Sequence, residues 1–167
     1  MNNPIQRMSA TAVLAALISA CGTSEQVLDI TYFQGLGVAK TSDYLKACVA
    51  EKKPLLERHD AAGLDRFAKS ARAANCLTAF KFAVDEEDKT LGTQRKAFET
   101  ATSQEALKTA RDTIHQDFES RWNEIITTFP EWKNFTNPLA SAIRGVDIAY
   151  SNASSKLAIK GMINYRR

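Results

Sequence analysis

Apolar side chains recur every three or four residues along most of this chain, which is the period of a helix with one buried face. The longest such stripe follows the sequence TSQE at residues 102–105, a capping-box pattern that marks a helix start. Pro130 ends it, and a shorter helical piece around residues 94–100 precedes it. The stripe consists of Leu107, Ala110, Ile114, Phe118, Trp122, Ile125 and Phe129.

Two further helices are predicted before this stripe. The first is capped by Thr41 or Ser42 and is kinked or ended by Pro54. The second begins after Asp60 and runs without a break to the acidic run at residues 85–88, which is typical of a solvated helix end and turn. The apolar face of the first is Tyr44, Leu45, Cys48 and Val49, and that of the second is Leu64, Phe67, Ala71, Ala74, Leu77 and Phe80.

A last helix is predicted to begin at Asn137, a cap followed by proline at the first helical position. Its apolar positions step alternately by four and three, which is a heptad-like seam over residues 139–157. Such a seam packs inside one domain or between two chains. We expect this seam to pack inside one domain and the protein to be a monomer. The alternative is a homo-oligomer that forms through this seam.

The segment Val27–Phe33 is ambiguous, because apolar and polar residues alternate in it as they do in a strand. No other segment offers a strand to pair with it, so we expect a short helix or an irregular packed segment. With strand signals nearly absent, the predicted fold is an all-α, up-and-down bundle of four or five helices.

The N-terminus carries a different apolar run, Ala10–Ala20, with no polar positions at helical spacing in its centre. A membrane-spanning helix needs about 20 apolar residues, so this run is too short and is typical of the apolar part of a secretion signal. The alternative, a buried N-terminal core helix, would need a polar face that Ala12–Ile18 lacks.

The run ends in the sequence LISAC at residues 17–21, which resembles the lipobox of bacterial lipoproteins. The resemblance covers the signal alone, and a single basic side chain before the run, Arg7, departs from the family pattern. It implies cleavage before Cys21, diacylation of its thiol and acylation of the new amino terminus. Because Gly22 is not aspartate, it also implies the periplasmic face of the outer membrane in a cell with two membranes.

We therefore expect a signal peptide at residues 1–20, a tether and irregular segment at 21–40, and the bundle at 41–167. If Cys21 carries lipid, Cys48 and Cys76 remain as an even pair in an exported protein, where disulfides persist. We predict that they form a bridge between the first two helices. The alternative is two buried free thiols that pack as small hydrophobes.

Charge and motifs exclude several classes of function. The chain has 22 basic and 19 acidic residues, a net charge of +3, which argues against a nucleic-acid partner. Nucleophile-elbow, Walker, dinucleotide, zinc and EF-hand patterns are absent. His59 lies in a hydrophilic turn, and His115 is two residues from Asp117, so these two side chains point to different sides of the helix and do not form a ready ligand pair. We predict no metal site, no cofactor and no identifiable catalytic group.

Two stretches are candidate contact surfaces. Phe129, Trp132 and Phe135 fall in one helix–helix connection, and aromatic residues are frequent at binding hot spots. They are the predicted partner-binding residues, with the alternative that they fold back and cap the bundle. The basic C-terminal segment 160–167 could contact anionic lipid or complement the end of a helix.

Together these patterns predict a lipid-anchored protein of the cell envelope with a non-enzymatic, protein-binding or accessory role. One alternative is an immunity or exclusion lipoprotein that neutralises a toxin or an incoming element. An enzyme acting on a cell-wall or lipid substrate is the other alternative.

Overall fold

The computed structural model describes residues 26–165, with side chains up to Met162. In this part of the chain six α-helices and two 3-10 helices occur, and no strand. The all-α bundle is therefore confirmed, with more helices than the four or five that the pattern predicts. The elements are α1 (Ile30–Leu36), α2 (Val38–Glu57), α3 (Ala61–Ala68), α4 (Ala71–Lys96), η1 (Ala97–Thr100), α5 (Gln104–Thr128), η2 (Pro130–Phe135) and α6 (Asn137–Tyr165).

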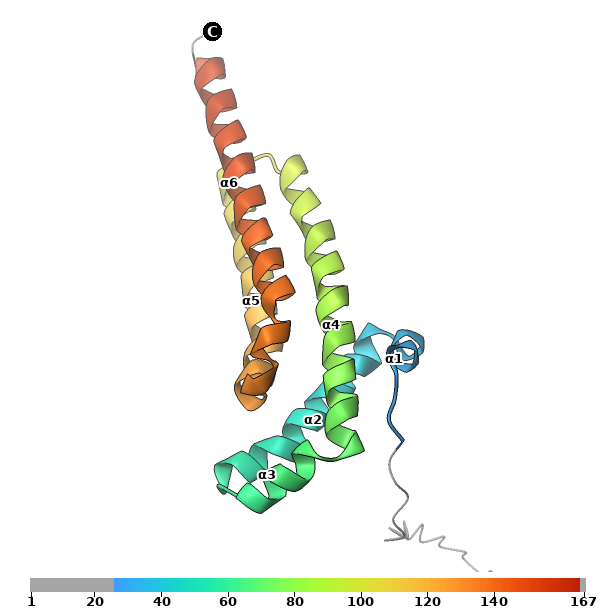
Figure 1. The fold of residues 1–167 in the computed structure, drawn as a ribbon. Coiled ribbons are helices and arrows are strands. Elements are labelled where there is room, and N and C mark those ends of the chain that lie inside the picture. The colour runs from blue at the N-terminus through green and yellow to red at the C-terminus, as the bar shows by residue number, and fades with distance from the viewer. Residues whose placement is uncertain (1–25, 166–167) are drawn as a thin grey trace, which may run out of the picture.

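The three long helices α4, α5 and α6 run side by side, with successive helices antiparallel (Figure 1). The short helices cover one end of this trio: α2 packs on both α4 and α5, and α1 and α3 pack on α2 and α4. The opposite end of the molecule consists of α4, η1, α5 and α6 alone (Figure 1). None of the helices between residues 26 and 165 combines the length and apolar character that a membrane span requires.

Side-chain caps set most of the helix starts. Asp60, Ser70 and Ser103 each accept a hydrogen bond from the backbone N–H three residues later, which satisfies a donor that the first helical turn leaves unpaired. The start of α2 is different, because Gly37 with a φ of +81° lets the chain turn directly from α1 into α2. The predicted cap at Thr41 is wrong, since its hydroxyl donates to the Gly37 carbonyl from inside the helix.

The second predicted helix is in fact two, α3 and α4. Ser70 makes the break: its hydroxyl donates to the carbonyl of Phe67 at the end of α3 and accepts from the N–H of Ala73 in α4. The apolar period continues across the break because both helices face the same core. The predicted helix end at residues 85–88 is also wrong, since α4 continues to Lys96 and buries Leu91 on the way.

Two groups of buried side chains form the interior. The first, which we call the stapled core, lies where all the helices except η1 meet. It contains Phe33, Leu45, Cys48, Val49, Cys76, Ala79, Phe80, Phe82, Val84, Trp122, Phe129, Trp132 and Leu139. The second, the tip core, lies between α4, η1, α5 and α6, and contains Leu91, Phe98, Leu107, Ile114, Ala142 and Val146.

The predicted disulfide is confirmed: Cys48 of α2 and Cys76 of α4 are bonded, with both residues fully buried in the stapled core. Their Cα atoms are 6.0 Å apart, within the usual range for a disulfide. The bridge therefore fixes α2 against α4 at the centre of the packed seam between these helices.

The segment expected to be a tether and irregular segment at residues 21–40 contains the short helix α1 and is packed on the bundle from its first described residue. Asn75, fully buried, donates to the carbonyl of Gln26 and accepts from the N–H of Leu28, with distances of 2.9 Å and 2.7 Å. Phe33 of α1 is fully buried beside Tyr44. The predicted signal peptide and Cys21 lie outside the described residues.

The α6 seam packs inside the domain, as expected. Of its members, Leu139 is in the stapled core and Val146 is in the tip core. The remaining members, Ile143 and Tyr150 among them, are partly buried against the tip core.

Candidate functional site

The aromatic connection between α5 and α6 is η2, and it folds back on the bundle. The rings of Phe129 and Trp132 stack with centroids 3.8 Å apart and planes within 6° of parallel. Trp132 also lies 4.8 Å from the ring of Phe80. Exposed fractions of 1% for Phe129 and 6% for Trp132 place both in the stapled core. Phe129 and Trp132 therefore fold back and cap the bundle, which was the alternative to an exposed contact surface.

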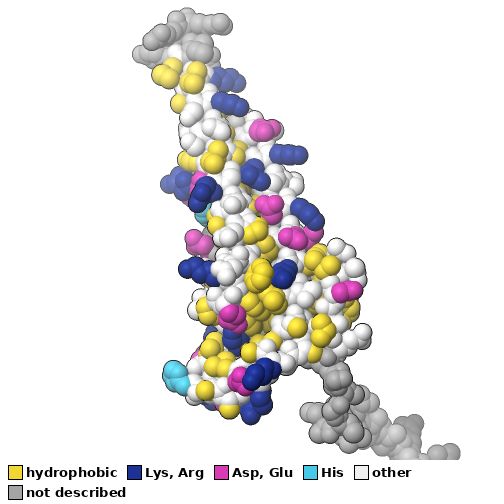
Figure 2. Space-filling view, viewed as in Figure 1, with side chains coloured by type: hydrophobic (Ala, Val, Ile, Leu, Met, Phe, Trp, Pro, Cys, Tyr) yellow, Lys and Arg dark blue, Asp and Glu magenta, His cyan; other side chains and the backbone are white. Residues whose placement is uncertain are grey.

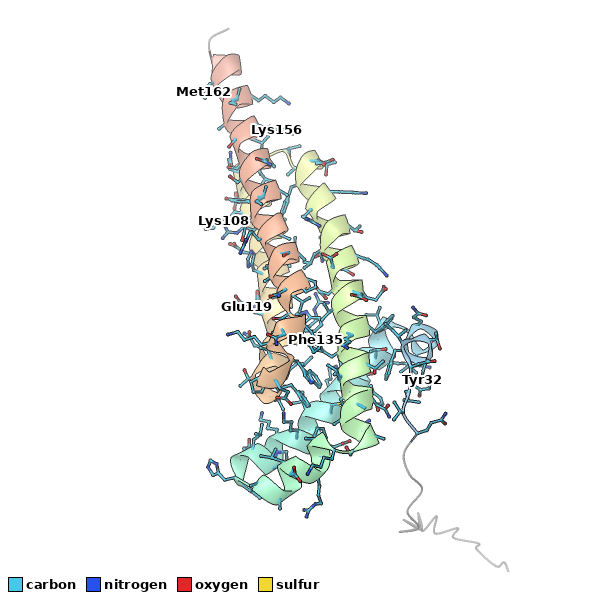
Figure 3. The ribbon with its side chains drawn as sticks, viewed as in Figure 1. Tyr32, Lys108, Glu119, Phe135, Lys156 and Met162 are labelled. Carbon is cyan, nitrogen blue, oxygen red and sulfur yellow. A yellow bond between two sulfur atoms is a disulfide. The ribbon has the colours of Figure 1, made fainter. Side chains whose placement is uncertain are left out.

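Phe135, the third predicted contact residue, is different. It is 39% exposed and lies at the end of η2 (Figure 3), where the ammonium group of Lys81 sits 4.5 Å from its ring centroid. The three residues thus do not form one exposed patch, and only Phe135 presents its ring to solvent.

An apolar pocket of about 610 Å³ opens beside the buried pair Phe129 and Trp132. Its other walls come from residues far away in the sequence, on α2, α3 and the start of α4. The main apolar side chains in these walls are Leu56, Leu64, Phe67 and Leu77. The pocket is thus a space between the aromatic connection and the α3 corner of the fold. Its volume is in the range of about 300–1,000 Å³ that ligand pockets occupy.

One ion pair gives this pocket a polar edge. Lys52 of α2 is 8% exposed, and its ammonium group lies 2.5 Å from a carboxylate oxygen of Glu131 in η2. The same ammonium group lies 4.4 Å from the ring centroid of Phe129, a cation–π distance. Lys52 therefore joins α2 to the aromatic connection and holds one wall of the pocket in place.

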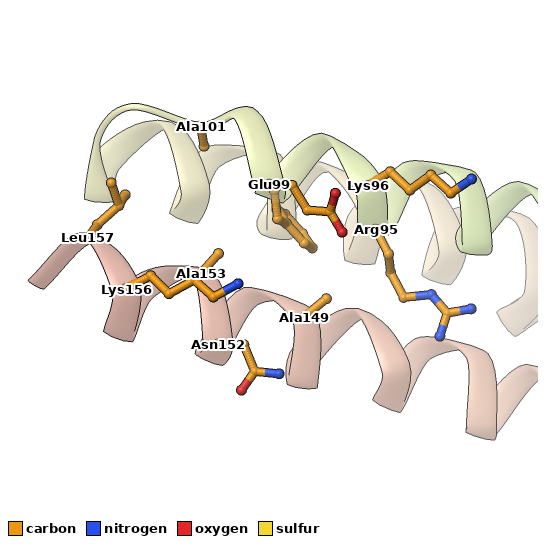
Figure 4. Close-up of a pocket in the computed structure, with 10 residues that line it drawn as sticks. Arg95, Lys96, Glu99, Ala101, Ala149, Asn152, Ala153, Lys156 and Leu157 are labelled. Atoms are coloured by element: carbon orange, nitrogen blue, oxygen red, sulfur yellow. The ribbon is translucent and has the colours of Figure 1, made fainter. Parts of the chain in front are cut away.

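A second pocket, of about 560 Å³, lies at the opposite end of the molecule between the end of α4, η1 and α6 (Figure 4). Figure 4 shows Glu99 and Lys156 reaching into it from opposite helices, with Arg95 spanning the gap beside them. Opposite charges share this pocket, so it has no single electrostatic character.

Neither His59 nor His115 lines either of these two pockets. His59 is exposed in the turn after α2, with a φ of +52°. His115 Nε2 lies 2.9 Å from a carboxylate oxygen of Asp147, a partner on α6 that the sequence pattern did not reveal. Within residues 26–165 no group of three or more His, Cys, Asp or Glu side chains could hold a metal ion.

Residues 85–88 hold a contact that sequence reasoning missed. Glu87 is 5% exposed and makes two bonds to the guanidinium of Arg121 on α5, at 2.8 Å and 3.0 Å. Burial raises the pKa of this carboxyl, and the charge of Arg121 offsets part of that rise. The pair joins α4 to α5 where the stapled core ends.

The pocket walls on α2 and α3 were also missed by sequence reasoning. Lys52 had one available signal, because it follows Leu45, Cys48 and Val49 on the apolar face of α2, where a charged residue needs a partner. Leu64 and Phe67 look like ordinary core positions in the sequence. Only the fold shows that they face a pocket.

No protein-family model, no curated protein and no solved structure matches this chain. The function is therefore inferred from the sequence motifs and from the geometry of the apolar pocket.

Proposed function

We propose that this protein is a lipid-anchored protein of the bacterial cell envelope that binds a protein partner through the apolar pocket, without catalysing a reaction. The observation that carries the proposal is the buried Cys48–Cys76 disulfide. Disulfides persist in oxidising compartments outside the cytosol. The bridge therefore agrees with the export signal that the lipobox-like sequence at residues 17–21 implies.

Lipidation of Cys21 would hold the domain close to the membrane. Two or more acyl chains are needed for stable anchoring, because one chain binds only marginally. Gln26, the first described residue, is hydrogen-bonded to Asn75 of the bundle. The five residue steps from Cys21 to Gln26 span at most about 18 Å when fully extended. The anchor would thus keep the end of the bundle that carries α1 and the disulfide near the lipid surface.

The apolar pocket supports the binding part of the proposal. Leu64 and Phe67 line it and are only partly buried, so they can gain contacts when a partner covers them. Phe129 and Trp132 serve as its rigid wall, whereas Phe135, exposed at the end of η2, does not line the pocket. We propose that apolar side chains of a partner protein occupy the pocket. Glu131 and Lys69 of this chain form the polar edge around them.

Affinity capture from membranes tests the binding site. Leu64→Ala and Phe67→Ala should each reduce capture of the partner about ten-fold or more, because hot-spot truncations cost about 2 kcal/mol or more. Ile148→Ala is the matched control, since Ile148 is 56% exposed and lies outside the pocket. Circular dichroism and an intact disulfide establish that each variant is folded.

Three results would contradict the proposal. If both pocket variants capture the partner as well as the parent chain does, the partner does not bind through the apolar pocket. Turnover of a cell-wall or lipid substrate by the purified protein would overturn the non-enzymatic role. Palmitate labelling and membrane fractionation that are unchanged in Cys21→Ser would overturn the lipid anchor.

A further inference from the structure

The last helix extends past the rest of the bundle. Gln104, the first residue of α5, exchanges hydrogen bonds with Ser154 of α6, at 2.8 Å and 2.7 Å. These bonds mark the level at which α5 begins. Residues 155–165, which we call the α6 tip, continue α6 by about 16 Å. Figure 1 shows this part of α6 standing clear of α4 and α5, at the end of the molecule far from α1.

The α6 tip exposes apolar side chains. Ile159 is 54% exposed and Met162 is 61% exposed, and their spacing of three residues places them on the same side of the helix. Leu157 faces a different side and is packed against the tip core. Ile159 and Met162 are thus not among the side chains that pack in either core.

The charge of α6 itself is one-sided beyond Asp147, although Glu99 of η1 lines the same pocket as Lys156. No acidic residue occurs after Asp147, whereas Lys156, Lys160, Arg166 and Arg167 are all basic. Lys156 and Lys160 are exposed and, four residues apart, lie along one flank of the helix beside the apolar side (Figure 3 labels Lys156 and Met162). In Figure 2 the basic side chains near the tip border the hydrophobic surface of α6.

We infer that the α6 tip docks on the anionic surface of a lipid bilayer. In this arrangement Ile159 and Met162 enter the boundary between headgroups and acyl chains, while Lys156 and Lys160 contact lipid phosphates. Charge complementarity favours an anionic bilayer. The tip carries basic residues with no acidic residue among its own positions, and anionic lipid headgroups attract such basic segments. The inference does not depend on Cys21, which belongs to the opposite end of the chain.

Vesicle co-sedimentation of the full chain carrying Cys21→Ser tests this inference. Binding to phosphatidylcholine vesicles is compared with binding to vesicles that also contain phosphatidylglycerol. Every variant is a full chain, so any contribution of residues 1–20 is common to all of them. We expect preferential binding to the anionic vesicles that weakens as salt is added. Lys156→Gln with Lys160→Gln should weaken this binding roughly ten- to thirty-fold, and Ile159→Ser with Met162→Ser about ten-fold or more.

Matched pairs of substitutions elsewhere serve as controls. Lys40→Gln with Lys133→Gln removes the same charge from exposed positions outside the tip, and Val27→Ser with Val38→Ser removes exposed apolar groups near α1. Both pairs should bind the anionic vesicles as the parent chain does. The inference is overturned if the parent chain binds both kinds of vesicle equally, if the tip variants bind like the parent, or if the control pairs lose as much binding.

Discussion

The two ends of the bundle are packed by different means. In the stapled core, the ring of Trp132 contacts those of Phe80 and Phe129, and a disulfide joins α2 to α4. Among the described residues of the tip core, Phe98 is the one buried aromatic residue, with Phe118 and Tyr150 partly buried against it, and the buried α6 contacts come from Ala142 and Val146. One end is therefore held by large rings and a covalent bond, and the other by smaller aliphatic contacts between three long helices.

This difference corresponds to what each end is proposed to do. A pocket that receives apolar side chains needs walls that do not collapse when it is empty, and rings fixed by stacking and by Lys52 supply them. A helix tip that docks on a lipid surface needs only a continuous helix and exposed side chains. The comparison predicts that stability is concentrated at the stapled end, and four experiments test this prediction.

The largest effect should come from removing a ring of the stapled core. Trp132→Ala should lower the free energy of unfolding by about 3–5 kcal/mol, because it leaves a cavity beside Phe80 and Phe129. Leu107→Ala in the tip core should cost less, about 2–3 kcal/mol, because a smaller side chain is removed. Urea denaturation with the disulfide intact measures both. A loss below about 1 kcal/mol for Trp132→Ala would show that this residue is not part of the core.

The disulfide should rank next. Its closed loop, with a sequence separation of 28, corresponds to about 3–4 kcal/mol in the chain-entropy description. Cys48→Ala with Cys76→Ala should therefore lower the free energy of unfolding by about that amount. Amide hydrogen exchange should speed up most in α2 and α3, which the bridge holds on α4, and least in the tip half of α6. Equal acceleration along the whole chain would contradict a division between the two ends.

The helices of this fold could be predicted from the sequence because period and caps are local properties. Ser103 and the stripe from Leu107 to Phe129 sufficed to place α5, and the disulfide followed from counting cysteines in a chain that begins with a lipobox-like sequence. The break at Ser70 was not predictable in this way, since α3 and α4 bury their apolar faces in one core and the period does not change.

The candidate site was predictable only in part. The aromatic connection was found, but whether Phe129 and Trp132 face a partner or the core depends on the position of α2 and α3, which no local pattern encodes. The pairing of Glu87 with Arg121 is of the same kind, because 34 residues separate them. In both cases the deciding contacts are between distant segments.

Two helical glycines allow a smaller test of the same comparison. At Gly63, near the pocket, an added Cβ would lie 2.8 Å from Cγ of Asp60 and 2.9 Å from Cδ2 of Leu55. Asp60 cannot move away freely because it caps α3, so Gly63→Ala should lower the free energy of unfolding by about 1–2 kcal/mol.

Gly145, near the tip core, is the matched position. There an added Cβ would meet only the side chain of Arg95, with Cζ at 3.1 Å and one terminal nitrogen closer still. That flexible side chain can swing aside, and alanine favours the helix by about 0.5–1 kcal/mol over glycine. Gly145→Ala should therefore leave stability unchanged or slightly raised in thermal denaturation. A large loss of stability in Gly145→Ala, or no loss in Gly63→Ala, would contradict the proposed difference between the stapled end and the tip end.

The smallest effect should be found at Glu87, which lies on α4 between the two cores. Because burial raises its pKa, the folded state binds this proton more tightly than the unfolded state does. The free energy of unfolding should then fall as pH rises from the ordinary value of 4.5 through the raised pKa, and level off above it. Glu87→Gln lacks this proton and keeps an acceptor for Arg121, so its stability relative to the parent chain should increase with pH over the same window.

Urea denaturation from about pH 4 to about pH 8 measures this difference, since the window brackets the range in which a raised glutamate pKa falls. Glu119→Gln is the control, because Glu119 is an exposed carboxylate on α5 (Figure 3). If the curves of Glu87→Gln and the parent chain stay parallel, the carboxyl at this boundary is as well solvated as Glu119. The α4–α5 contact between the cores would then be open to water, and the two ends of the bundle would be separated by a hydrated layer rather than by a buried ion pair.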